Sequence, residues 1–126
     1  MTVAFVDTSC LVAIAFSEPG AAELAARLRE FDLLVGSNLL EAELRAVLAR
    51  EEVSTDLELL ERITWLIPDR PLSREITTVL GAGYLRGADL WHLACALFLS
   101  GSPRELPFLT LDERQGAVAH KLGFPA

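Results

Sequence analysis

The chain has 126 residues, a formal net charge of −7 and 52% hydrophobic residues. This length and composition predict one folded domain, residues 1–126, with a core that needs no disulfide or structural metal, and they exclude a disordered chain. The negative charge argues against general coating of nucleic acid, because such binding neutralises phosphates with Lys and Arg. A bound divalent cation would limit that objection, since it supplies positive charge locally.

The order of secondary structure follows from short apolar runs that alternate with amphipathic segments. In chain order we expect strand 3–6, helix 10–16, helix 21–28, strand 32–36, helix 37–51, helix 54–65, strand 65–67, helix 73–84, helix 90–99, strand 106–109 and helix 112–121. The tail after Gly123 can add a fragment of edge strand. This alternation predicts a three-layer α/β/α domain with a largely parallel central sheet.

The apolar runs are too short to span a bilayer, and no basic region precedes an apolar segment at the N-terminus. We therefore expect a cytoplasmic protein without a membrane segment. Cys10 and Cys95 lie in apolar helical contexts and are expected to be reduced core thiols.

The first strand, Val3–Val6, ends at a carboxylate, Asp7. Its four apolar residues suit a parallel strand that is covered on both faces. Ligands of open α/β sheets bind at the carboxyl ends of strands, so Asp7 is either a ligand or the cap of the next helix. Thr8 or Ser9 can also cap that helix.

The helix over residues 37–51 contains two glutamates with different surroundings. If Asn38 is the N-cap, Glu41 completes a capping box, which is a sufficient structural reason for it. Glu43 lies among apolar neighbours on the inward side, where a carboxylate is costly unless it is paired or bound to a metal. Pairing with Arg50, or a position at the edge of the apolar face, would also explain it.

Two further acids stand where inward-facing helices begin. Asp89 precedes a helix that is apolar nearly all round and therefore belongs in the centre of the molecule. The helix dipole favours an acid in the first turn, and His92 is better explained as a core histidine than as a ligand. Asp112 fits a capping box with Gln115 at the start of the last helix.

Four acidic residues thus occupy similar positions, at a strand end or in the first turns of an inward-facing helix: Asp7, Glu43, Asp89 and Asp112. Such positions can gather at one edge of a parallel sheet. Four carboxylates in one pocket repel one another, so a hard cation is their natural companion. An all-oxygen site favours Mg²⁺ or Mn²⁺ over zinc, and such a metal can orient a phosphodiester and ionise an attacking water.

Four short motifs hold these acids in register along the chain. They are Val6-Asp7-Thr8-Ser9, Ser37-Asn38-Leu39-Leu40-Glu41-Ala42-Glu43-Leu44, Gly87-Ala88-Asp89-Leu90-Trp91-His92-Leu93-Ala94 and Leu109-Thr110-Leu111-Asp112. Through these motifs essentially the whole chain resembles the PIN-domain ribonucleases, and most of all the VapC-type toxins of toxin–antitoxin pairs.

The resemblance implies a PIN fold, endonucleolytic cleavage of RNA that depends on Mg²⁺ or Mn²⁺, inhibition by a small cognate antitoxin, and commonly toxin dimers. It implies that the acidic quartet, meaning Asp7, Glu43, Asp89 and Asp112, is catalytic and binds the metal, with hydrogen-bonding support from Thr8, Ser9 and Thr110. Glu43 rather than Glu41 matches the Ala-Glu-Leu pattern of the family. Arg45, Arg86 and Arg114 lie near the quartet in sequence and are candidate RNA contacts, although a solvated face is the simpler explanation of each.

Other readings of the acidic strand end fit less well. A phospho-accepting receiver domain needs a lysine near its last strand, but Lys121, in the terminal helix, is the only lysine. A haloacid-dehalogenase-type phosphatase needs Asp-x-Asp, and here Ser9 fills the second place. The alternative from a different class is a non-catalytic PIN scaffold that binds a protein or RNA; such a scaffold has no need to keep four costly charges together.

Overall fold

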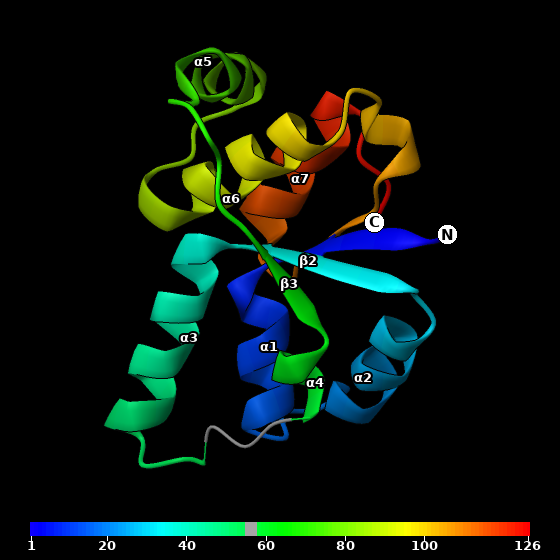
Figure 1. Ribbon diagram of the computed structural model, residues 1–126, viewed down its shortest axis with the longest axis vertical. Helices are drawn as coiled ribbons and strands as arrows, with labels where there is room; N and C mark the ends of the chain where they lie inside the picture. Colours follow the sequence, from blue (N-terminus) through cyan, green and yellow to red (C-terminus); the bar gives the residue numbers. More distant parts are fainter. Residues whose placement is uncertain (55–57) are drawn as a thin grey trace.

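A parallel β-sheet forms the centre of the fold (Figure 1). In this computed structural model, which describes residues 1–54 and 58–126, the strand order is β3-β2-β1-β4 and every neighbouring pair is parallel. The strands are β1 (Val3–Val6), β2 (Leu33–Ser37), β3 (Ile63–Leu66) and β4 (Phe108–Leu109). The first strand therefore lies inside the sheet, and the residue that follows it lies between the ends of β2 and β4.

Helices cover both faces of this sheet (Figure 1). One face carries α1 (Thr8–Ala15), α2 (Ala21–Arg29), α3 (Asn38–Arg50) and the short α4 (Glu58–Glu61). The other face carries α5 (Ser73–Ala82), α6 (Gly87–Leu99) and α7 (Glu113–Leu122), and a 3₁₀ turn, η1 (Pro103–Glu105), precedes β4. The predicted three-layer α/β/α arrangement with a parallel sheet is confirmed.

Alternating side chains of the strands build two separate cores. Ala4 and Val6 of β1 join the cluster beneath α1 and α3, whereas Phe5 joins the cluster beneath α6 and α7 and stacks on Phe108 at 5.7 Å between ring centroids. This division follows from the period of two in a strand, which sends neighbouring side chains to opposite faces. The central stretch of α6, Leu93–Ala96, is fully buried, as predicted for a helix that is apolar nearly all round.

Both cysteines are core thiols. Cys10 and Cys95 are buried and free, each in one of the two clusters. Burial raises the pKa of each thiol to about 12, with the charge of Asp7 as a second cause for Cys10. Both thiols are therefore protonated at neutral pH and poorly reactive.

Several predicted boundaries are wrong. The apolar pattern predicts a helix over residues 54–65, but the described part of this stretch ends its helix at Glu61, and β3 begins at Ile63 because that residue pairs in parallel with β2. The sequence also predicts a capping box between Thr55 and Glu58, but Thr55 lies outside the described residues. The tail forms no strand in the part of the chain that the structure describes; it is attached by a backbone hydrogen bond of 2.8 Å from Phe108 to Pro125.

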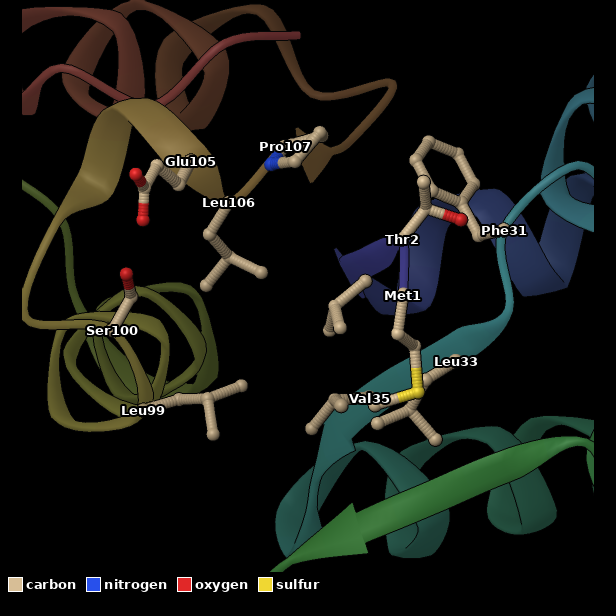
Figure 2. A pocket seen from close by; sticks show the side chains of 11 residues that line it. Met1, Thr2, Phe31, Leu33, Val35, Leu99, Ser100, Glu105, Leu106 and Pro107 are labelled. Carbon is tan, nitrogen blue, oxygen red and sulfur yellow. The ribbon is translucent and has the colours of Figure 1, made fainter.

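A cavity of about 630 Å³ opens at the amino-terminal ends of β1 and β2 (Figure 2). Leu99 and Leu106 line one side of it, and Leu33 and Val35 line the other. This edge of the sheet is opposite to the one at which the acidic residues follow the strands. Among the described helices, none combines the length and the apolar character that a bilayer crossing requires.

Candidate active site

Polar side chains gather at the carboxyl ends of β1, β2 and β4. Asp7 follows β1, is 3% exposed and caps α1 by accepting a hydrogen bond of 3.0 Å from the backbone N–H of Ser9. Asp112 caps α7 by accepting a hydrogen bond of 2.8 Å from the backbone N–H of Gln115. Each cap occupies one oxygen of its carboxylate, so capping leaves the other oxygen available for a second role.

Glu43 is turned from α3 toward the end of β1. Its Oε1 accepts a hydrogen bond of 2.8 Å from the Thr8 hydroxyl and lies 2.7 Å from Nε2 of His92. The partner that the sequence offered, Arg50, pairs with Glu51 at 3.0 Å instead. Glu43 is therefore oriented by neighbours from α1 and α6, elements far away in sequence.

Glu41 lies on the outer side of the same helix. It pairs with Arg45 one turn along the helix at 3.0 Å. The predicted capping box between Asn38 and Glu41 is wrong, because Ser37 is the cap and accepts a hydrogen bond of 3.2 Å from the backbone N–H of Leu40. The structure thus separates the two glutamates by their partners: Glu43 contacts Thr8 and His92 near the strand ends, whereas Glu41 pairs with Arg45 on its own helix.

His92 is a fully buried core histidine, as predicted, and it holds Glu43 in place. Its Nδ1 lies 2.6 Å from the Ser37 hydroxyl, and its Nε2 lies 2.7 Å from Glu43. A carboxylate can only accept, so Nε2 donates to Glu43, and Nδ1 faces the Ser37 hydroxyl. This chain of contacts ties α6, the N-terminus of α3 and Glu43 together.

Gln115 is a member of the site that the sequence reasoning missed. It is fully buried; its amide nitrogen donates to Asp7 Oδ1 at 3.1 Å and to the Asp89 carbonyl at 3.2 Å, and its amide oxygen accepts from Thr110 at 2.7 Å. The predicted capping box with Asp112 is therefore only half formed, because the Gln115 side chain turns inward. The sequence contained one signal of this role. Gln115 lies three and four residues before Val118 and Ala119, both buried, and this helical spacing places the polar side chain of Gln115 on the inward face of α7.

The three predicted supporting hydroxyls all join this network. Thr8 contacts Glu43, as described above, and the Thr110 hydroxyl lies 3.4 Å from Asp7 Oδ2. The Ser9 hydroxyl lies 3.3 Å from that of Thr110 and accepts a hydrogen bond of 2.9 Å from the backbone N–H of Leu111. The hydroxyls therefore fix the ends of β1 and β4 relative to each other.

Asp89 is half-buried in the first turn of α6, and its carboxylate has no hydrogen-bond or ion-pair partner among the residues that the structure describes. Its pKa is raised above the ordinary value, first by burial and then by the negative charges of Asp7, Asp112 and Glu43, with His92 acting in the opposite direction. The other three acids are thus close enough to disfavour ionisation of Asp89, which is the electrostatic sign of a shared acidic region.

A pH dependence of stability follows from the raised pKa of Asp89. The folded state binds this proton more tightly than the unfolded chain, so this group's contribution to stability falls as pH rises from the ordinary value of 3.8 through the raised value. We expect the Asp89→Asn variant, in chelator, to gain stability relative to wild type between about pH 4 and about pH 7. Urea unfolding of both proteins measures this; a stability difference that does not change with pH would contradict it.

The sequence comparisons agree with this geometry. The family model described as PIN domain matches residues 4–121, a stretch that contains all four members of the acidic quartet. The chain belongs to the PIN domain family. PIN domains are generally nucleases, and PIN nucleases usually use divalent metal ions. A comparison with curated protein sequences finds no match.

The acidic quartet of this PIN domain suits a divalent cation by its chemistry. Every side-chain donor is a carboxylate oxygen, the type that Mg²⁺ and Mn²⁺ prefer, and the pKa of Asp89 is raised by burial and, in second place, by a repulsion from the other acids that a cation would relieve. Within the described residues, however, no three side chains of His, Cys, Asp or Glu are arranged to hold one ion. To hold a metal ion together, the carboxylates of the quartet therefore have to move closer to one another than they are in this structure.

The predicted RNA contacts differ in their availability. Arg45 is held by Glu41, on the solvent side of α3. Arg86 precedes α6 and Arg114 lies in the first turn of α7; both are exposed, and neither forms an ion pair with another residue in the described part of the chain. Arg86 and Arg114 are therefore the two of the three that remain free for a phosphate.

Proposed function

We propose that this PIN domain is an endoribonuclease, dependent on Mg²⁺ or Mn²⁺, that hydrolyses RNA phosphodiesters with metal-activated water at the acidic quartet. The observation that carries the proposal is the grouping of four carboxylates, two from helices α3 and α6 and two that cap α1 and α7, at one edge of the sheet of a PIN fold. A scaffold has no use for this repulsion, whereas a metal-dependent hydrolase needs it.

The residues of the chain divide the work between holding the cation and orienting its ligands. Asp7, Glu43 and Asp89 would hold the cation, with Asp112 as a ligand through water or to a second ion. A bound divalent cation supplies positive charge to the phosphate and acidifies water. Partners in the surrounding shell fix the carboxylates: Gln115 donates to Asp7, and His92 donates to Glu43.

The biological role that we propose is that of the toxin of a type II toxin–antitoxin system. A small cognate antitoxin would inhibit the enzyme, and the toxin would form a homodimer of a single domain, residues 1–126, in the cytoplasm. The net charge of −7 supports a basic partner, since charge complementarity speeds association and selects partners. Expression should arrest growth, and coexpression with a small basic protein encoded next to it should relieve the arrest.

Glu41 and Glu43, which are two residues apart on α3, offer a matched test of the nuclease proposal. We expect Glu43→Gln to reduce cleavage of a labelled single-stranded RNA in Mg²⁺ or Mn²⁺ by about 100-fold or more, because it removes one negative ligand. Glu41→Gln changes the charge equally on the same helix and should leave cleavage near the wild-type rate. Initial rates of purified proteins, with chelator as a blank, measure this; equal losses in both variants would count against it.

A non-catalytic PIN module that binds RNA or protein is the second candidate. It is favoured by one observation, namely that no closed set of metal-ligating side chains exists among the described residues. It predicts that wild-type protein binds RNA or a protein partner but leaves RNA intact at every divalent metal concentration. The wild-type arm of the cleavage assay therefore decides between the two.

A further inference from the structure

A groove of about 570 Å³ lies between α7 and the link from α5 to α6. Tyr84, on the link, forms one wall, and Arg114 and Lys121, on α7, form the other. Glu113 also lines the groove and is the negative side chain among its walls. The groove is separate from the contacts of the acidic quartet described above, and none of its lining residues belongs to the quartet.

The two cations of the groove share one face of α7. They are seven residues apart, close to two helical turns, which corresponds to roughly 10 Å along the helix axis. Both are exposed, and in the described part of the chain neither pairs with a carboxylate. In a chain with a net charge of −7, the groove thus keeps two positive charges available for a ligand.

Tyr84 presents an aromatic ring to the groove. It is 65% exposed, so the face of the ring is open to a ligand. The preceding residue explains its position: a Cβ at Gly83 would lie 2.7 Å from Cγ2 of Val118, so only glycine lets the link pack this closely on α7. The ring is therefore held next to the helix that carries the two cations.

Both walls of the groove lead to the acidic quartet. Tyr84 lies five residues before Asp89 along the link into α6, with Arg86 between them, and Arg114 lies two residues after Asp112. An RNA strand that is cleaved at the quartet must extend over the protein surface on both sides of the scissile phosphate. The groove supplies an aromatic face for an unstacked base and cations for phosphates, the combination by which proteins bind single strands.

We propose that this groove binds single-stranded RNA next to the scissile phosphate, with one base stacked on Tyr84 and the backbone held by Arg114 and Lys121. The proposal rests on the nuclease function proposed above, whose substrate it narrows to unpaired RNA. An acidic peptide would bind the same cations but gains less from the exposed ring of Tyr84. Binding of an acidic peptide is therefore the alternative that the experiments must distinguish from RNA binding.

Lys121 is the only lysine of the chain, which allows a direct footprint. Wild-type protein in chelator is treated with an amine-acylating reagent, with and without a single-stranded oligoribonucleotide, and acylation is followed by mass spectrometry. We expect RNA to slow acylation of Lys121 at least about fivefold. The amine of Met1 is the internal control, because Met1 is 93% exposed and lines the cavity at the opposite edge of the sheet.

Binding of the same oligoribonucleotide, followed by fluorescence anisotropy, tests the two contact types separately. Tyr84→Ala should weaken binding at least about fivefold while Tyr84→Phe, which keeps the ring, should not. Arg114→Ala should weaken it, whereas Arg29→Ala, an equal charge change on α2 at the other face of the sheet, should not. Equal effects of Arg114→Ala and Arg29→Ala would overturn the proposal.

The outcomes also separate this proposal from the nuclease function. Protection of Lys121 equal to that of the Met1 amine would overturn the groove even if RNA is cleaved in Mg²⁺ or Mn²⁺. Protection of Lys121 without any cleavage would support the groove and overturn the nuclease function. Equal protection by polyglutamate and by RNA, together with unchanged binding by Tyr84→Ala, would assign the groove to an acidic peptide instead.

Discussion

Replacing Asp7 with Asn should abolish RNA cleavage, by about 100-fold or more, and leave the protein folded. Asp7 is the most buried acid of the quartet and lies between β2 and β4 at the end of β1. Asn has nearly the same shape and is as good an N-cap, so the hydrogen bond from Ser9 can persist. The variant therefore removes a negative charge from the metal ligands without removing the cap of α1.

The control for Asp7→Asn is Asp32→Asn. Asp32 accepts a hydrogen bond of 2.8 Å from the backbone N–H of Thr2 and lies at the start of β2, away from the quartet. Its replacement also removes a carboxylate but should not change the cleavage rate. Initial cleavage rates and thermal unfolding of both variants are the measurements; full activity of a folded Asp7→Asn protein would refute the assignment of this residue.

Divalent metal should stabilise the folded protein strongly. Burial and the charges of the other three acids raise the pKa of Asp89, so a nearby cation would favour its ionised form. A metal ion that binds only the folded state adds to stability by mass action. At a metal concentration of about 100 times Kd the gain is about 2.7 kcal/mol, which corresponds to a rise in Tm on the order of 10 °C for a chain of this size.

Two variants test whether this stabilisation comes from the quartet. We expect Asp89→Asn to lose most of the rise in Tm in Mn²⁺, because it removes a carboxylate that has no other partner in the described part of the chain. Glu41→Gln should keep the full rise, since Glu41 is paired with Arg45 in solvent. Thermal unfolding in Mn²⁺ and in chelator measures both; an equal rise in wild type and Asp89→Asn would place the metal elsewhere.

The fold could be predicted from the sequence because its elements are locally encoded. The four apolar residues of β1 and the all-round apolar α6 each indicated their element and its burial. The stretch around β3 failed because Ile63 continues the helical apolar spacing of Leu59 and Leu60, and pairing with β2 decides for a strand. Such a choice depends on a neighbour that is distant in sequence.

The candidate site could be predicted in its charged members but not in the contacts that orient them. Position at a strand end or in the first turns of an inward-facing helix singled out the four acids, and the inward side of α3 distinguished Glu43 from Glu41. The roles of Gln115, which binds Asp7, and of His92, which binds Glu43, required the packing of α6 and α7 against the sheet. These contacts join residues between about 50 and about 110 positions apart, beyond the reach of local patterns.

The acidic quartet is expected to bind a divalent metal ion. A crystal grown with Mn²⁺ and measured for anomalous scattering tests it directly, because manganese contributes a signal that the protein's own carbon, nitrogen and oxygen atoms do not. The account predicts an anomalous peak within bonding distance of carboxylate oxygens of Asp7, Glu43 and Asp89, about 2.0–2.3 Å for each bond. A well-ordered quartet with no peak beside it at saturating Mn²⁺ would contradict the claim.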